Sequence, residues 1–180
     1  AGMIWIGTVG ALSRWDRSTG QFVHFQHDPD DFGSVPNFPV EAIHEDRDGT
    51  LWLGASGGGL IKMDRETGTF AHFVHDDADP ASLSHNVVDA IHEDRDGVLW
   101  AGTWGGGLNR FDRAAGRFSH YRHDSADPGS LIDDQVNAIY EDRRGALASS
   151  AQIIFRCTDA QARMAQVDTA RLPEAAAADR

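Results

Sequence analysis

Short apolar segments separated by polar turns follow one another along most of the chain. Residues 88–123 contain four of them, Val88–Asp94, Val98–Thr103, Gly107–Asp112 and Arg117–His123, each rich in Val, Ile, Leu, Trp, Phe or Tyr. Segments this short do not make stable helices, and their composition is typical of β-strands. The turns between them contain Asp and end on Gly, which favours hairpins. The pattern therefore predicts a four-stranded antiparallel sheet.

The four-strand pattern repeats every 48 residues. The repeat aligns Ile43 with Ile91 and Ile139, Leu51 with Leu99 and Leu147, and Trp52 with Trp100, and Trp5 is the matching tryptophan of the first copy, 47 residues before Trp52. A fixed period of this length indicates a solenoid or a propeller, because each unit buries its apolar faces only against a neighbouring copy. Strands that are apolar on both faces fit the blades of a propeller. We therefore predict an all-β, incomplete β-propeller with the repeated tryptophans packed between its blades.

Two full copies lie between two partial ones. Residues 40–75 and 88–123 are complete, residues 3–27 hold the second, third and fourth strands, and residues 136–147 hold a first strand and the start of a second. Together they supply about three blades, fewer than the roughly four to eight that close a propeller ring. We expect a fragment whose missing blades come from the rest of a parent protein.

Longer connections join one copy to the next, at residues 28–39, 76–87 and 124–135. Because successive strands run antiparallel, these crossover loops are predicted to share a face with the turns between the second and third strands. The acidic hairpins, such as the one at residues 46–49, are predicted on the opposite face. The first loop, DPDDFGSVPNFP, differs from the others in adding two phenylalanines, at 32 and 38.

The repeat stops abruptly after Leu147. Its register predicts Trp at 148 and Gly at 150, where the chain has Ala148 and Ser150. The codons of the next residues, read one frame over, permit Val, Gly and Thr in that order. We interpret residues 148–180 as a divergent tail that is read out of frame or is poorly ordered.

The motif between Ile91 and Leu108, Ile-x-Glu-Asp-x-x-Gly-x-Leu-Trp-x-Gly-Thr-x-Gly-Gly-Gly-Leu, resembles the two-component-regulator propeller repeat. That repeat builds the extracytoplasmic sensor region of bacterial hybrid histidine kinases and of some diguanylate cyclase receptors. The resemblance covers residues 3–147. It implies a periplasmic, ligand-sensing propeller with no catalytic activity of its own, but it does not say which ligand. We expect the ligand to be an unidentified small molecule or glycan.

Composition narrows the classes of partner. The formal net charge of −12 argues against nucleic acid, because binding a phosphate backbone needs clustered Lys and Arg. No apolar run approaches the roughly 18 residues of a membrane-spanning helix, so we expect no direct membrane insertion by this segment. The single cysteine, Cys157, lies outside the repeats and predicts no disulfide framework.

Several recurring polar groups are interpreted as structural. The histidines three residues apart, as in His72 and His75, point to opposite faces of a strand and do not converge on a metal. The turn at residues 46–49 has two carboxylates before a glycine but lacks the further ligands of a calcium loop. Glu93 and Asp94 recur with the repeat, whereas a catalytic pair belongs to one site. We therefore predict no metal, no cofactor and no catalytic residues.

Trp104 departs from the repeat, since the equivalent positions hold Val9 and Ser56. The blade does not require an aromatic side chain at this turn, which lies on the crossover-loop side. We predict a ligand-binding set of Trp104, His85 and Asn86. The alternative is that Trp104 is half-covered by a neighbouring loop and has only a structural role.

Two other functions stay open from the sequence. A propeller enzyme that acts on polysaccharide is one alternative, and a pure protein-interaction scaffold is the other. Hydrolysis of a glycan would identify the enzyme, saturable binding without turnover the sensor, and neither result the scaffold.

Overall fold

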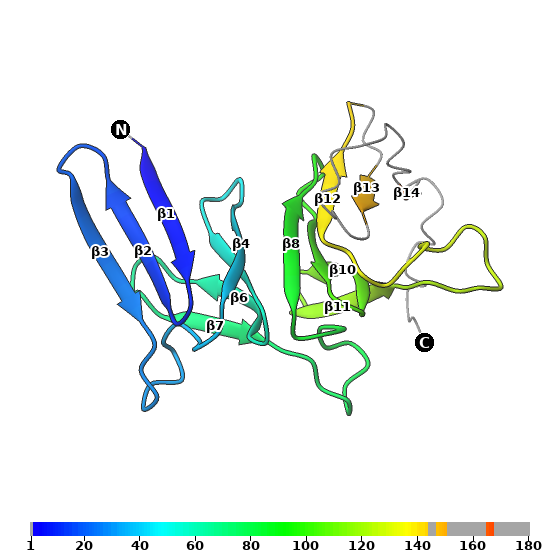
Figure 1. Ribbon diagram of the computed structural model, residues 1–180, viewed down its shortest axis with the longest axis horizontal. Coiled ribbons are helices and arrows are strands. Elements are labelled where there is room, and N and C mark those ends of the chain that lie inside the picture. Colours follow the sequence, from blue (N-terminus) through cyan, green and yellow to red (C-terminus); the bar gives the residue numbers. More distant parts are fainter. Residues whose placement is uncertain (1, 144–146, 151–164, 168–180) are drawn as a thin grey trace, which may run out of the picture.

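Four antiparallel sheets follow one another along the chain in the computed structural model (Figure 1), which describes residues 2–143, 147–150 and 165–167. The first sheet contains β1 (Met3–Thr8), β2 (Ala11–Asp16) and β3 (Gln21–Gln26). The second contains β4 (Val40–Glu45), β5 (Leu51–Ala55), β6 (Gly59–Met63) and β7 (Phe70–Phe73). The third contains β8 (Val88–Glu93), β9 (Leu99–Thr103), β10 (Gly107–Asp112) and β11 (Arg117–Tyr121). The fourth contains β12 (Ala138–Glu141), β13 (Leu147–Ser150) and β14 (Ala165–Val167).

Each sheet is a meander in which consecutive strands pair antiparallel. The two complete sheets have the same register, because Trp52 lies opposite His44 and Trp100 lies opposite His92. The prediction of an all-β, open set of four-stranded propeller blades is confirmed. Within the described ranges, no helix is long and apolar enough to cross a membrane.

The backbone of β13 continues past the point where the repeat motif stops. The strand runs to Ser150 and pairs with β12 on one side and with β14 on the other. Most of the tail predicted at 148–180 lies outside the described residues, and its reading frame stays a prediction.

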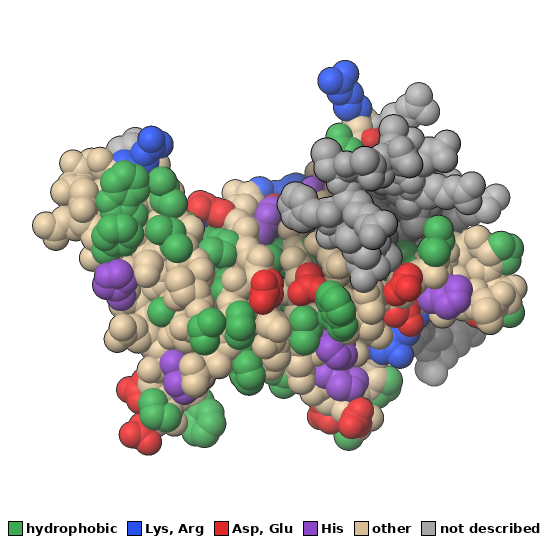
Figure 2. All heavy atoms as spheres, viewed as in Figure 1, with side chains coloured by type: hydrophobic (Ala, Val, Ile, Leu, Met, Phe, Trp, Pro, Cys, Tyr) green, Lys and Arg blue, Asp and Glu red, His purple; other side chains and the backbone are tan. Residues whose placement is uncertain are grey.

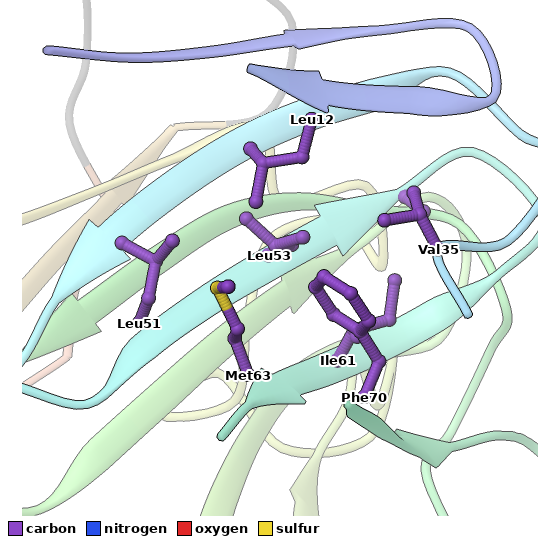
Figure 3. Close-up of a cluster of buried hydrophobic side chains, with 8 residues drawn as sticks. Leu12, Val35, Leu51, Leu53, Ile61, Met63 and Phe70 are labelled. Atoms are coloured by element: carbon purple, nitrogen blue, oxygen red, sulfur yellow. The ribbon is translucent and has the colours of Figure 1, made fainter. Parts of the chain in front are cut away.

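The hydrophobic core lies between the sheets. One cluster joins Leu12 of the first sheet to the face of the second sheet, with Val35 of the intervening loop at its edge (Figure 3). The next cluster joins the second sheet to the third, where the rings of Trp52 and Phe111 meet at a centroid distance of 5.4 Å. The second and third sheets therefore bury both faces against their neighbours, as the repeat predicted, whereas the first sheet leaves apolar side chains such as Ile4 and Phe22 exposed.

The tryptophans of the two complete sheets are buried core, as predicted. Trp52 lies within the second cluster, and Trp100 packs against Leu108 and Val136 in a third. Trp5 of the first sheet is only partly buried, and it packs against the cluster around Leu51.

Close approach of neighbouring sheets explains the glycine that follows each of these tryptophans by two positions. A Cβ atom on Gly54 would lie 2.6 Å from the Val88 carbonyl oxygen, and one on Gly102 would lie 2.5 Å from that of Val136. Both distances are shorter than any van der Waals contact, so a side chain at either position would push two sheets apart. The glycine is thus required by packing between sheets.

A buried carboxylate organises each acidic hairpin. Asp46 Oδ1 accepts hydrogen bonds from the backbone N–H groups of Asp48 and Thr50, and its Oδ2 accepts one from Trp52 Nε1 at 2.8 Å. Asp94 makes the same bonds one repeat later, including one from Trp100 Nε1 at 2.7 Å. These turns are hairpins, as predicted, and their first Asp also holds the indole of the next strand.

Ion pairs join neighbouring blades on this same face. Glu93 accepts hydrogen bonds from the Arg47 backbone N–H at 2.8 Å and from Arg113 Nη2 at 3.0 Å. Arg113 also donates from Nη1 to Asp46 Oδ2 at 2.6 Å. Glu141 accepts the backbone N–H of Arg95 in the same way, one repeat later. The recurring carboxylates are therefore used in contacts between blades.

We expect Trp100→Ala to lower the free energy of unfolding by about 3–5 kcal/mol, the range for truncating a buried aromatic side chain. The indole is 2% exposed, and its loss also leaves Asp94 Oδ2 without the indole N–H. Chemical denaturation measures the change. Trp104→Ala is the matched control, because its ring is half exposed, and we expect it to cost less than about 1 kcal/mol. A similar small loss for Trp100→Ala would contradict its place in the core.

The hairpin also predicts how stability depends on pH. Burial raises the pKa of Asp46, but hydrogen bonds from Arg113, Trp52 and Thr50 outweigh burial, so the pKa lies below its ordinary value. Its ionised form therefore stabilises the fold above the ordinary pKa, and that contribution is lost as the pH falls through the lowered pKa. Asp46→Asn should be less stable than the unaltered chain at pH 7.

The difference between the two proteins should shrink below about pH 4, where the unaltered carboxyl also becomes protonated. Urea denaturation at a series of pH values measures both effects. Asp48→Asn in the same turn is the control, since its side chain is exposed, and it should leave the stability profile unchanged. An equal gap at all pH values for Asp46→Asn would rule out the ionised carboxylate as the cause.

Candidate ligand-binding face

Three loops and three turns share one face of the molecule, as strand parity predicted. This crossover face consists of the loops at 28–39, 76–87 and 124–135 and the turns at 9–10, 56–58 and 104–106. Isolated bridges pair Val9 with Pro39, Ser56 with Val87 and Trp104 with Gln135. Each crossover loop therefore lies directly beside a turn of the preceding sheet.

One histidine of each pair fixes the end of a crossover loop. His27 donates from Nδ1 to the Val35 carbonyl at 2.9 Å, and His75 donates to that of Leu83 at 2.7 Å. The other histidine of the second pair, His72, donates from Nε2 to the Ser34 carbonyl at 3.2 Å. The recurring histidines thus support the loops. In the part of the chain that the structure describes, no three potential metal-binding side chains converge.

The three predicted ligand-binding residues lie close together, but only Trp104 presents its side chain freely. Its ring is 47% exposed. His85 Nδ1 accepts the Val87 N–H at 3.1 Å, and Asn86 Oδ1 accepts the His75 N–H at 2.7 Å. Two of the three side chains thus stabilise their own loop, and the role of Trp104 in binding stays a prediction.

A pocket that the sequence analysis did not identify lies at the first crossover loop. Its volume is about 640 Å³, and the loop, the Gly57-Gly58 turn and the end of the second sheet line it. Phe32, Phe38 and Val74 provide its exposed apolar surface. Figure 2 shows hydrophobic and acidic side chains together at the lower left, on the loop that follows β3 in Figure 1.

The floor of this pocket depends on two glycines. A Cβ atom on Gly57 would lie 2.8 Å from Phe38 Cδ1, and one on Gly58 would lie 3.3 Å from Phe38 Cδ2. The Phe38 ring therefore rests directly on the glycine turn, in space that any side chain would fill. One repeat later, a Cβ atom on Gly105 would meet nothing within 4 Å.

An equivalent but polar pocket occurs one repeat later, with a volume of about 360 Å³. Pro80 occupies the position of Phe32, Asp77 that of Pro29 and Arg122 that of Val74, each 48 residues on. The backbone of the repeat therefore makes a hollow at this place, and the side chains of each copy decide its chemistry.

The phenylalanines of the first loop were the available signal for this pocket. They depart from the pattern Ala-Asp-Pro-x-Ser-Leu of the other two loops, just as Trp104 departs from the repeat at its turn. Phe32 and Phe38 line the same pocket as Val74 only because the loop packs against the second sheet, which the sequence pattern does not show. The three apolar side chains are suited to binding an apolar group, and two of the polar lining residues, His27 and His72, already hydrogen-bond loop carbonyls.

Solved structures with this arrangement of blades include two extracellular domains from B. thetaiotaomicron. The extracellular domain of a hybrid two component system is 25% identical, with a TM-score of 0.65 over 82% of this chain and 19% of that domain's chain. A second such domain is 22% identical, with a TM-score of 0.70 over 82% of this chain and 20% of the other, and it shows likeness of fold alone. The chain thus spans about a fifth of these relatives.

No curated protein sequence matches the chain. A family model, however, agrees with the structural similarities. The model of the two component regulator propeller matches residues 33–57 and 82–105, each of which runs from a crossover loop through the acidic hairpin into the turn beyond. Two segments of the chain therefore match the two component regulator propeller repeat, as the motif predicted.

Proposed function

We propose that this chain is part of an extracytoplasmic, ligand-sensing β-propeller of a bacterial signal-transduction receptor, and that it has no catalytic activity itself. The extracellular domains of two component systems to which it is similar support a location outside the cytoplasm. In this proposal the location is the periplasm. The missing blades and a kinase or cyclase output domain belong to the parent receptor.

One observation carries the proposal: side chains that depart from the repeat are exposed on the crossover face, whereas recurring polar side chains are used in structure. Asp46, His75 and Glu93 each hydrogen-bond within or between blades. Phe32 and Trp104, which have no aromatic equivalents in the other copies, are exposed. A scaffold that is constant in its polar contacts and variable on one face is suited to recognising ligands.

Binding without turnover is the result that this function predicts. The chain is titrated with a panel of neutral and charged oligosaccharides and small metabolites by calorimetry, and the same mixtures are followed by chromatography for products. We expect at least one saturable ligand and no product. Release of product would favour the polysaccharide enzyme, and the absence of any saturable ligand would favour the scaffold.

Trp104→Ala then tests where the ligand binds. If Trp104 contacts the ligand, we expect affinity to fall by about five- to a hundredfold, the equivalent of about 1–3 kcal/mol for one lost stacking contact. Phe22→Ala is the matched control, because Phe22 is an exposed aromatic residue on β3, away from the crossover loops. Unchanged affinity in Trp104→Ala would show that this residue does not contact the ligand.

A further inference from the structure

The pocket at the first crossover loop is an apolar departure from the repeat on the crossover face. We name it the Phe32–Phe38 pocket, with Val74 as its third apolar side chain. The Phe32 side chain is 96% exposed, so nearly all of its apolar surface faces water. Leaving that much aromatic surface in water forgoes a favourable burial of about 25 cal/mol per Å². A bound ring that covers Phe32 and Phe38 would recover it.

The pocket is preformed on its inner side. Phe38 rests on the Gly57-Gly58 turn, and Pro36 beneath it is buried. The Ser34 carbonyl accepts the hydrogen bond from His72, which ties the loop to the second sheet. A ligand therefore meets a Phe38 ring that is already fixed, and little binding energy is lost in ordering that ring.

Charge limits what can enter. The residues that line the pocket include Asp28 and Asp31 and include neither Lys nor Arg. Asp28 Oδ1 accepts the Asp30 N–H at 3.0 Å and Asp31 Oδ1 accepts the Gly33 N–H at 2.8 Å, so both carboxylates are held in place by their own loop. Two negative charges in the pocket lining repel an anion and attract a hydrogen-bond donor.

The second copy supplies an internal comparison. Its pocket has Arg122 where the first has Val74, and Asp77 where the first has Pro29, on an equivalent backbone. Of these two pockets, only the first has the apolar side chains Phe32 and Val74 and no Arg in its lining, so the repeat itself does not impose these features.

We infer that the Phe32–Phe38 pocket binds a ring that has an apolar face, carries a hydrogen-bond donor and bears no negative charge. The inference rests on the proposed sensing function and names its ligand class. Both an arylalkyl amine, such as 2-phenylethylamine, and a neutral sugar ring have this chemistry. Phe32 and Phe38 cover the apolar face, and Asp28 and Asp31 accept hydrogen bonds from the ammonium or hydroxyl groups.

Three probes that differ in charge and ring type test the ligand class. They are 2-phenylethylamine, phenylacetate, which has the same ring with a negative charge, and methyl β-glucoside, a neutral sugar. Saturation-transfer NMR with the full chain at low salt measures their affinities. We expect the amine, the sugar or both to bind, and phenylacetate to bind at least about tenfold more weakly than the better of them.

Binding of the amine alone identifies an aromatic cation as the source of the ring, and binding of the sugar alone identifies a carbohydrate. Equal or tighter binding of phenylacetate would overturn the inference, as would the failure of both the amine and the sugar to bind.

Phe32→Ala tests the location, and its exposure means that the fold does not depend on it. We expect the affinity of the best probe to fall by about fivefold or more, with an unchanged thermal melting curve. Pro80→Ala, at the equivalent position of the second loop, is the matched control and should leave affinity unchanged.

Unchanged affinity in Phe32→Ala would show that the ligand binds elsewhere and would overturn the inference about this pocket, while the proposed sensing function would stand. The sensing function itself fails if the panel of oligosaccharides and metabolites shows no saturable ligand, or if product is released. The two failures are therefore distinguishable.

Discussion

Burial of each sheet between its neighbours is the constraint on which the rest of this structure depends. A single four-stranded sheet cannot bury both of its apolar faces, so every blade needs another on each side. The tryptophans at the second strand lie in these contacts, and Gly54 and Gly102 let the backbones approach. The carboxylates of Asp46 and Asp94 then orient the indoles from the hairpin side. Apolar packing brings the blades together, and hydrogen bonds set their register.

The period and the strands could be predicted from the sequence because both depend on local composition. The face shared by the crossover loops could also be predicted, because it depends only on successive strands running in opposite directions. The carboxylate–indole bond could not, because Asp46 and Trp52 belong to a turn and to the next strand, and spacing alone does not say which side chain is buried. The ion pair between Glu93 and Arg47 joins two blades, and the sequence gives no measure of their approach.

The candidate site was predicted only in part for a related reason. A departure from the repeat shows that the scaffold does not require a given side chain, and this rule singled out Trp104. The rule does not show whether a side chain lines a hollow. The Phe32–Phe38 pocket needs Gly57 beneath Phe38 and Val74 in its lining. These two residues come from a turn and from the residue after β7, both distant from the loop in sequence. Asn86, by contrast, is used within its own loop.

The histidine hydrogen bonds at the crossover loops fix the path of each loop, and other positions of the loop line its pocket. His27 and His75 fix the loop path through backbone carbonyls, which are the same whatever side chains the loop carries. The positions of Phe32 and its equivalent Pro80 line the pockets but make no such bond. Under the proposed sensing function, substitutions at these positions would change the ligand that a loop binds without changing the path of its backbone. The blades of one propeller could then differ in selectivity while their shared structure stays the same.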